Sequence, residues 1–258
     1  MWAHLVQKSA SVSRHHAGSV LRGLFHLVYP PACAHCHARV AAHQALCAHC
    51  WGDLRLIEKP YCPVLGLPFA HDPGEGMLSP QAIAHPPVFD RLRSVALHEG
   101  VARHLVHDLK YRDRVDLAPM MAGWMLRAAF PEIAAADAIV AIPLHRMRMF
   151  RRMFNQSAEL ARHLSHQSGK PFLAHALVRR KRTQQQVGLT ANQRSLNVRG
   201  AFQVPEGTEP LVFGKRLVLV DDVYTTGATV SAATSALKKA GVADVTVLTF
   251  ARALAGPI

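Results

Sequence analysis

The chain has 258 residues, half of which are hydrophobic, and its 30 Lys and Arg residues against 17 Asp and Glu residues give a formal net charge of +13. The hydrophobic content excludes a disordered basic tail, and no apolar run reaches the roughly 18 residues that a membrane-spanning helix needs. The charge indicates an anionic partner such as a nucleic acid, but residues 137–205 alone carry twelve basic and two acidic side chains. We therefore expect one local cationic surface, with a solvated basic face of no function as the alternative.

The first 32 residues form a basic arm with three Lys or Arg residues and no acidic residue. Apolar residues recur at helical spacing between Val20 and Val28 and stop before Pro30 and Pro31, which predicts a short amphipathic helix. We expect this helix to pack on the protein itself, and a membrane-surface helix is the alternative. The arm lacks the continuous apolar core and the small-residue cleavage site of a secretory signal. The sequence therefore predicts a cytoplasmic protein.

Four of the five cysteines form two Cys-x-x-Cys pairs that are ten residues apart, namely Cys33, Cys36, Cys47 and Cys50. Two such pairs can place four thiolates tetrahedrally around one Zn²⁺ ion, whose preference for sulfur favours this ligand set. The alternative is a pair of disulfides in a secreted protein, which the missing export signal disfavours. Four cysteines leave no open coordination position, so the predicted zinc is structural and not catalytic.

A connector rich in proline and glycine follows the cysteine pairs. Residues 63–87 contain six prolines and three glycines, a density that excludes long helices and strands. We place a domain boundary near residue 88. The predicted organisation is therefore an arm over residues 1–32, a zinc-binding segment and connector over residues 33–87, and a larger domain over residues 88–258.

A dense group of arginines lies within residues 145–152. Arg146, Arg148, Arg151 and Arg152 alternate there with three apolar residues, which can pack on the protein while the arginines face outward. In an enzyme these arginines would neutralise a pyrophosphate. In a nucleic-acid-binding protein they would contact backbone phosphates, with an affinity that falls as salt rises. Both interpretations stay open.

The best-defined site of the sequence begins at residue 217. Residues 217–220 predict a short buried strand of the parallel-sheet kind, and Asp221 and Asp222 follow directly. A helical pattern begins near Ala228 and stops near Gly241, and a second strand is predicted over residues 245–250. In open parallel sheets, ligands bind at the carboxyl ends of the strands, which is where the two carboxylates would lie.

Each residue type in this loop suits a sugar phosphate. Paired carboxylates can accept hydrogen bonds from the vicinal hydroxyls of a ribose and help to hold Mg²⁺. Thr225, Thr226 and Thr229 supply hydroxyls, and Gly227 lets the backbone approach a ligand closely. The amides at the start of the following helix can bind a phosphate. Neither a Walker A loop nor the G-x-G-x-x-G fingerprint of dinucleotide-binding proteins occurs in the sequence.

The run from Leu219 to Thr229 resembles the phosphoribosyl pyrophosphate (PRPP) binding motif of type I phosphoribosyltransferases. With the four-cysteine segment upstream, the chain resembles the ComF family of competence-associated, phosphoribosyltransferase-like proteins over residues 24–252. This resemblance implies an α/β fold of the type I phosphoribosyltransferase kind, a parallel-sheet core with flanking helices, preceded by a small Cys₄ zinc-ribbon arm. The other matching segments are residues 109–112, 142–144, 154–156, 159–162, 186–190 and 200–202, with Arg194 and Asn197.

The resemblance also implies a role for each segment. Asp221 and Asp222 would bind the ribose of PRPP, with Mg²⁺ between the sugar and the pyrophosphate. The 5′-phosphate would be held by Thr225, Thr226, Gly227, Ala228 and Thr229. The pyrophosphate would contact Pro143, Leu144, His145 and Arg146. A mobile loop that closes over the site would include Arg179, Arg180, Lys181, Arg182, Gln186 and Arg194.

The sequence departs from the family pattern at two places. Met153 stands where the family often has a glycine, before the Phe-Asn-Gln segment. Of a second cysteine set only Cys62 remains, with Leu65 where a partner would stand. We therefore expect Cys62 to be a buried thiol and not a ligand of a second metal.

Three functions follow from these observations. The first is a PRPP-binding phosphoribosyltransferase, in which Mg²⁺ and nearby cations stabilise the leaving pyrophosphate while an acceptor that the sequence does not identify takes the ribosyl group. The second is a non-catalytic DNA-uptake factor that binds single-stranded DNA or a helicase partner, as the resemblance implies. The third is a regulator that senses PRPP without turning it over.

Overall fold

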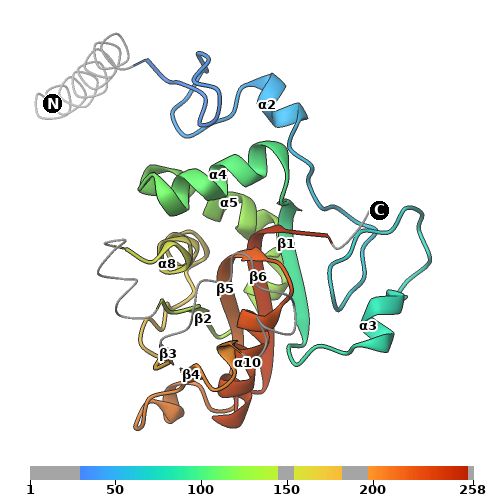
Figure 1. Cartoon of the computed structure of the whole chain (residues 1–258), viewed down its shortest axis with the longest axis vertical. Coiled ribbons are helices and arrows are strands. Elements are labelled where there is room, and N and C mark those ends of the chain that lie inside the picture. Colours follow the sequence, from blue (N-terminus) through green and yellow to red (C-terminus); the bar gives the residue numbers. More distant parts are fainter. Residues whose placement is uncertain (1–29, 145–153, 182–196, 255–258) are drawn as a thin grey trace, which may run out of the picture. The chain divides into compact units, whose positions relative to one another are not determined.

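The structure is a computed structural model that describes residues 30–144, 154–181 and 197–254 (Figure 1). The chain divides into two compact units, residues 1–51 and residues 52–258. The described part of the first unit contains the four paired cysteines and most of the short helix α2 (Ala48–Gly52). The amphipathic helix predicted between Val20 and Val28 lies outside the described residues. The boundary expected near residue 88 stays a prediction.

The second unit is built on a four-stranded sheet in which all neighbouring strands are parallel. The strand order is β1-β6-β5-β2, so β5 and β6 lie in the middle. Six of the nine residues of β5 and eight of the nine residues of β6 are buried, as expected of a parallel sheet that is covered on both faces. The strands are β1 (Arg91–Leu97), β2 (Ala138–Ala141), β5 (Arg216–Tyr224) and β6 (Asp244–Arg252).

Both strands predicted in the C-terminal part are confirmed, and both are longer than predicted. The strand predicted over residues 217–220 continues to Tyr224, because its last residues still pair with the end of β6. The strand predicted over residues 245–250 runs from Asp244 to Arg252. Asp221 and Asp222 therefore belong to β5 itself and not to the loop that follows it.

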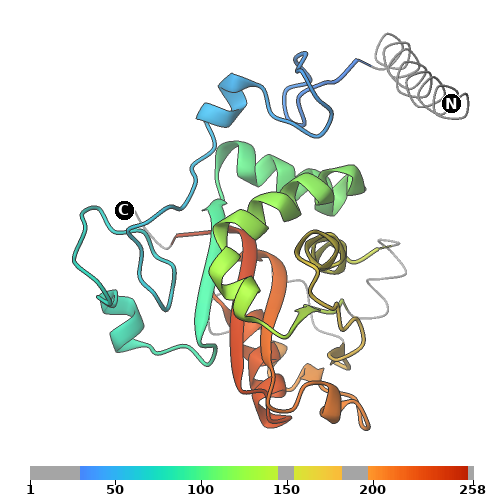
Figure 2. The same cartoon turned by 180° about the vertical axis from the view of Figure 1, so that it is seen from behind.

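Helices cover both faces of the sheet (Figures 1 and 2). α5 packs against β1 and β6, α8 packs against β2 and β5, and α10 contacts β5 from the opposite face. Successive side chains of a strand point to opposite faces, so Leu217 and Leu219 of β5 pack together with Val230 and Leu237 of α10. The helices are α4 (Gly100–Tyr111), α5 (Ala118–Ala128), α6 (Phe130–Ala135), α8 (Gln156–Ser168) and α10 (Ala228–Lys239).

The remaining elements are short. Within residues 63–87, where prolines and glycines are dense, the only helix of the described structure is the five-residue α3 (Pro80–Ala84). No helix of the described residues combines the length and the apolar character needed to cross a membrane. The other short elements are the 3₁₀ helices η1 (Val115–Leu117) and η2 (Glu209–Leu211), and the antiparallel pair β3 (Val178–Arg179) and β4 (Phe202–Gln203).

A tight turn at Cys62 packs against the edge strand β1. The turn closes through the hydrogen bond from Gly66 N to Cys62 O, and Leu92 N of β1 donates to Val64 O at 2.8 Å. Gly66 has φ +58°, and a Cβ atom placed on it would lie 2.5 Å from Leu92 O. A side chain at this position would therefore push the turn away from the strand.

We expect Gly66→Ala to lower the free energy of unfolding of the chain. Gly74→Ala is the matched control, because Gly74 also has a positive φ but no atom lies within 4 Å of the added Cβ. The close approach to β1 should make Gly66→Ala more destabilising than Gly74→Ala by about 1–3 kcal/mol. Urea unfolding followed by circular dichroism measures both values, and equal losses would contradict the close contact.

Candidate functional site

Two of the predicted segments meet at the carboxyl edge of the sheet. β2 and β5 are parallel neighbours, with Ala141 opposite Val220, and Ile142 N donates to Val220 O at 2.9 Å. The loop that begins with the half-buried Pro143 and Leu144 therefore starts beside the point where Asp221 and Asp222 follow Val220. His145 and Arg146, the other residues predicted to contact a pyrophosphate, lie outside the described residues.

Asp221 and Asp222 form a buried acid pair, with 9% and 5% of their surface exposed. Asp221 Oδ1 accepts hydrogen bonds from Ser157 Oγ at 2.9 Å and from the Asp222 amide at 2.9 Å. Asp222 Oδ1 accepts from the Val223 amide at 2.8 Å. Asp222 Oδ2 accepts from Gln156 Nε2 at 3.3 Å and forms an ion pair with Lys110 Nζ at 3.0 Å. Side chains from α4 and α8 thus hold the carboxylates of β5.

The segment Phe154-Asn155-Gln156 explains how α8 reaches the acid pair. Asn155 is the N-cap of α8 and accepts a hydrogen bond from Ser157 N at 3.1 Å. Asn155 Nδ2 also donates to Ile142 O at 3.0 Å. One asparagine therefore joins the end of β2 to the start of α8, which places Gln156 and Ser157 over Asp222 and Asp221.

The two carboxyl groups differ in acidity. Burial raises the pKa of Asp221 to about 7, and the negative charge of Asp222 adds to this effect. Burial also raises the pKa of Asp222, but the ammonium of Lys110 and the hydrogen bonds outweigh burial, so this pKa lies below its usual value. Asp222 therefore ionises readily, whereas Asp221 keeps its proton to a higher pH than an ordinary aspartate does.

The loop after β5 has the geometry of an anion site. Thr225 and Thr226 are exposed, and Gly227 is the N-cap of the twelve-residue helix α10, which has no side-chain cap. Gly227 has φ +76°, and a Cβ atom on it would lie 2.5 Å from Tyr224 Oη. The first amides of a helix attract anions. The half-buried Ala228 and Thr229 supply the first two of them.

The segment expected to form a mobile loop begins with ordered structure. Arg179 belongs to β3 and is buried, and its guanidinium lies 5.2 Å from the ring centroid of Phe202 in β4. Arg179 therefore lies in a strand and not in a loop, because its backbone pairs with Phe202 of β4. Arg180 and Lys181 follow and are exposed. Arg182, Gln186 and Arg194 lie outside the described residues.

The sequence did not identify the polar partners of the acid pair. Lys110 and Gln156 fall within the segments that carry the family resemblance, but nothing in those segments assigns them to Asp222. No motif of the sequence pointed to Ser157 or to the half-buried His98. Burial lowers the pKa of His98, and the negative charge of Asp222 offsets part of this effect. Their placement depends on how α4 and α8 dock on the sheet, which periodicity does not specify.

The four predicted zinc ligands come together in the first unit. The Sγ atoms of Cys33, Cys36, Cys47 and Cys50 all lie within 4.8 Å of one another. The Cys36 and Cys47 sulfurs are 3.6 Å apart, which is too far for a disulfide. Zn–S bonds of about 2.3 Å in a tetrahedron separate the sulfurs by about 3.8 Å, so the cluster fits a structural Zn²⁺ ion.

The thiols of this cluster differ in acidity, because burial and the contacts with the other three cysteines raise the pKa of Cys50, whereas hydrogen bonds favour the thiolate form of Cys33. Burial raises the pKa of the Cys33 thiol, but backbone N–H groups around the sulfur outweigh burial and lower it to about 6. One of these donors is the Cys47 amide, at 3.3 Å. Cys62 lies elsewhere, in the second unit, where it is fully buried and its sulfur accepts hydrogen bonds from the amides of Leu65 and Ser79.

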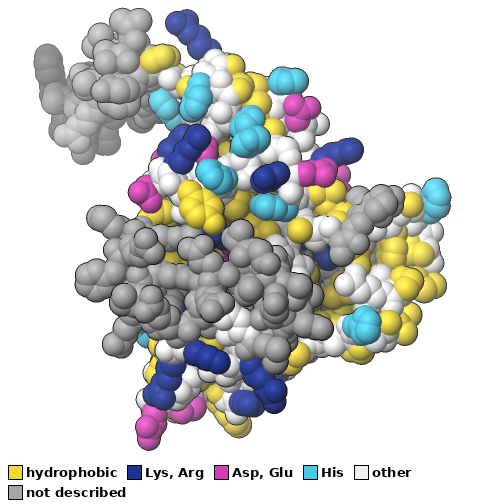
Figure 3. Space-filling view, in the orientation of Figure 1, with side chains coloured by type: hydrophobic (Ala, Val, Ile, Leu, Met, Phe, Trp, Pro, Cys, Tyr) yellow, Lys and Arg dark blue, Asp and Glu magenta, His cyan; other side chains and the backbone are white. Residues whose placement is uncertain are grey.

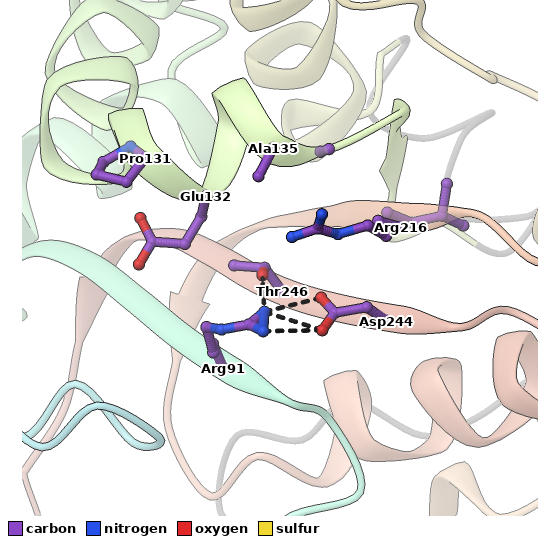
Figure 4. Close-up of a pocket in the computed structure, with 9 residues that line it drawn as sticks. Arg91, Pro131, Glu132, Ala135, Arg216, Asp244 and Thr246 are labelled. Atoms are coloured by element: carbon purple, nitrogen blue, oxygen red, sulfur yellow. Dashed lines mark hydrogen bonds and ion pairs between the residues drawn. The ribbon is translucent and has the colours of Figure 1, made fainter. Parts of the chain in front are cut away.

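A pocket of about 210 Å³ lies at the opposite, amino edge of the sheet, between α6 and the starts of β1, β5 and β6 (Figure 4). Most of its charged side chains form ion pairs. Arg91 forms a two-pronged ion pair with Asp244 and also donates to Thr246, and Glu132 pairs with Arg93 at 2.6 Å. The first pair joins β1 to β6 and the second joins β1 to α6. None of the predicted site residues lines the pocket.

The cationic surface that the charge count predicts stays a prediction, because half of the basic residues within 137–205 lie outside the described residues. On the face shown in Figure 3, the described Lys and Arg side chains lie in several small groups, with Asp and Glu side chains near some of them. Arg162 pairs with Glu159 at 2.6 Å, and Arg179 is buried. Six of the twelve basic residues within 137–205 lie outside the described residues.

Comparison with known proteins links both parts of the chain to described families. Residues 24–82 match the double zinc ribbon domain, and residues 155–257 match the phosphoribosyl transferase domain. DNA utilization protein YhgH of Salmonella typhimurium is 32% identical over 234 residues, which are 88% of this chain and 100% of that protein. Competence protein F of Haemophilus influenzae is 26% identical over 227 residues, which are 86% of this chain and 96% of that protein.

Among solved structures, the match to the glutamine PRPP amidotransferase of B. subtilis, complexed with ADP and GMP, has a TM-score of 0.37 and 22% identity. It covers 55% of this chain and 30% of that chain.

The zinc site predicts that Cys33→Ser loses the metal. Purified wild-type chain should contain about one zinc ion, and Cys33→Ser should contain much less, because a structural site needs all four ligands. Cys62→Ser is the matched control and should keep its zinc, because Cys62 is not part of the cluster. Elemental analysis by mass spectrometry measures the content. An unchanged zinc content in Cys33→Ser would refute the four-cysteine site.

The raised pKa of Asp221 predicts a pH-dependent cost to stability. In the unfolded chain this carboxyl ionises near its ordinary pKa of 3.8, whereas in the folded protein its pKa is about 7. The folded state therefore binds more protons between about pH 4 and 7, and the contribution of Asp221 to stability is lost as pH rises through this window. Asp221→Asn should remove the loss and be more stable than wild type at pH 8 by a few kcal/mol.

Urea unfolding at pH 5 and pH 8, without added divalent metal, measures this difference. Asp116→Asn is the control, because Arg114 lowers the pKa of Asp116 and its effect on stability should not change between pH 5 and 8. An Asp221→Asn difference that does not grow from pH 5 to pH 8 would show that Asp221 is ionised throughout.

Proposed function

This chain belongs to the family of DNA utilization protein YhgH and competence protein F, and on that premise we propose that its phosphoribosyltransferase-type domain binds PRPP at the carboxyl end of β5. The observation that carries the proposal is the direct succession of the buried acid pair and the Gly227-capped start of α10. Acceptors for sugar hydroxyls and donors for a phosphate thus follow one another on a single strand end, as a ribose 5-phosphate group requires.

Each part of the ligand has residues that suit it. The vicinal hydroxyls of the ribose would donate to Asp221 and Asp222. The 5′-phosphate would accept from the loop Thr225–Thr229 and the first amides of α10. The pyrophosphate would lie at the loop that follows β2, which comprises Pro143, Leu144, His145 and Arg146. Arg180 and Lys181, near the start of the predicted mobile loop, would add positive charge.

The chemistry that this arrangement supports is phosphoribosyl transfer. The C1′–O bond to pyrophosphate breaks, positive charge develops on the ribose, and a nucleophile of the acceptor forms the new bond to C1′. Mg²⁺, bound with the pyrophosphate, would offset the charge of the leaving group. The protein's own part is electrostatic: the carboxylates orient the ribose and favour its positive charge, and the arginines favour the departing anion.

The names of the relatives support a second candidate function, the handling of DNA. Competence and DNA utilization involve nucleic acid, and the basic excess of residues 137–205 would bind the phosphates of single-stranded DNA. A helicase-type partner would be consistent with the same role. A regulator that senses PRPP without turnover is the third candidate. Since the zinc site needs reduced cysteines, we propose the cytoplasm as the compartment.

Calorimetric titration with Mg²⁺–PRPP tests the proposal. Wild type should bind, and Asp221→Asn and Asp222→Asn should each bind at least about tenfold more weakly, because each loses charged acceptors for a ribose hydroxyl. Asp116→Asn, which removes an exposed carboxylate paired with Arg114, should bind as wild type does. Absence of binding to the wild type would refute both PRPP-dependent candidates.

Two further measurements separate the candidates. If PRPP binds, release of pyrophosphate in the presence of nucleobases or amines indicates transfer, and its absence across such acceptors favours the sensor. Titration with a single-stranded oligonucleotide over a salt series tests the DNA function, which requires binding at low salt that weakens as salt rises.

A further inference from the structure

A lysine occupies the position on the acid pair where a cation is expected. Lys110 is in the last turn of α4, between the buried Leu109 and the exposed Tyr111. Its side chain is 28% exposed, and Nζ lies 3.0 Å from Asp222 Oδ2. Burial lowers the pKa of Lys110, but the charges of Asp222 and Asp221 outweigh burial and raise it above its usual value. The side chain is therefore an ammonium ion held against the acid pair.

The two carboxylates already make five polar contacts, out of the roughly eight lone-pair sites that they offer. Both oxygens of Asp222 accept hydrogen bonds, and Oδ2 also faces the ammonium. Asp221 Oδ1 accepts two hydrogen bonds. Of the four carboxylate oxygens, only Asp221 Oδ2 accepts no hydrogen bond from the described residues. Mg²⁺ usually takes one or two carboxylates and completes its shell with water and phosphate, but here a second cation beside the ammonium would be repelled.

We infer that Lys110 substitutes for a divalent cation on the acid pair. Its ammonium orients Asp222 through the 3.0 Å ion pair and excludes a metal from the carboxylates, so a ribose can bind to them with no metal ion on the pair. Any Mg²⁺ then enters with the pyrophosphate and is held by that group and by water. Lys110 is thus a positioning residue that acts through Asp222. The inference rests on the proposed function only for the identity of the ligand, because the exclusion of metal can be measured without any ligand.

The inference predicts that removal of the ammonium creates a metal site. In zinc-loaded full-length chain, Lys110→Met should bind Mn²⁺ at least about tenfold more tightly than wild type, because the repelling charge is gone and the carboxylates are left uncompensated. Lys110→Arg keeps the charge and should bind Mn²⁺ as weakly as wild type. The electron paramagnetic resonance signal of free Mn²⁺ measures the affinity directly.

Arg112→Met is the matched control. It removes a positive charge two residues along the chain, but Arg112 pairs with Asp108 and not with the acid pair. It should leave Mn²⁺ binding unchanged, and an equal gain in Arg112→Met would show that net charge alone is responsible. The gained site should disappear in Lys110→Met combined with Asp222→Asn, which locates it on the pair. Equal Mn²⁺ affinities in Lys110→Met and wild type would overturn the inference.

Two readouts keep the outcome clear. The thermal midpoint of Lys110→Met should rise on addition of Mn²⁺, because the metal binds the folded state, whereas that of wild type should not. Ribose 5-phosphate, which has no pyrophosphate to carry a metal, should bind wild type without divalent cation and bind Lys110→Met only when Mn²⁺ is present. If neither wild type nor Lys110→Met binds ribose 5-phosphate while Lys110→Met gains the Mn²⁺ site, the proposed function fails and the role of Lys110 stands.

Discussion

Two carboxylates buried side by side on a central strand impose the main constraint on this structure. An ionised carboxylate loses its hydration on burial, and the loss is large unless donors or an opposite charge replace the water. Here the donors come from β5 itself and from α8, and the opposite charge comes from α4. The docking of both helices at the carboxyl edge of the sheet therefore lowers the free-energy cost of burying the acid pair. The site and the fold thus stabilise each other.

The difference between local and non-local information explains what could be predicted from the sequence. The strand, the loop, the helix and the second strand between residues 217 and 252 are contiguous, and their apolar periodicity and Gly227 are visible in a single run. The four zinc ligands are likewise visible from their spacing. Gln156 is 66 residues from Asp222 in the sequence, Ser157 is 64 residues from Asp221, and Lys110 is farther still. These side chains reach the acid pair through helix packing, which no local pattern encodes.

One basic residue shows why a charge count does not by itself locate a cationic surface. A run of basic residues predicts a solvated loop, yet Arg179, the first of such a run, is buried in β3 over the ring of Phe202. The long apolar stem and flat guanidinium of arginine allow this, because the side chain can pack like an aromatic residue while its charge interacts with a π face. A count of charged residues along the sequence therefore does not show which of their side chains lie on the surface.

The two cysteine-containing turns illustrate when a small segment needs a metal. In the described part of the first unit, the only buried residues are Pro31, Cys33, Ala34 and Cys50. They are too few for an apolar core to stabilise the segment, so metal–thiolate bonds must supply the stability. The turn at Cys62 packs on β1, where Cys62 and Leu65 join the hydrophobic cluster of the sheet together with Leu92. Its sulfur is satisfied by two backbone amides. Burial against the sheet and the hydrogen bonds to the sulfur thus stabilise this turn.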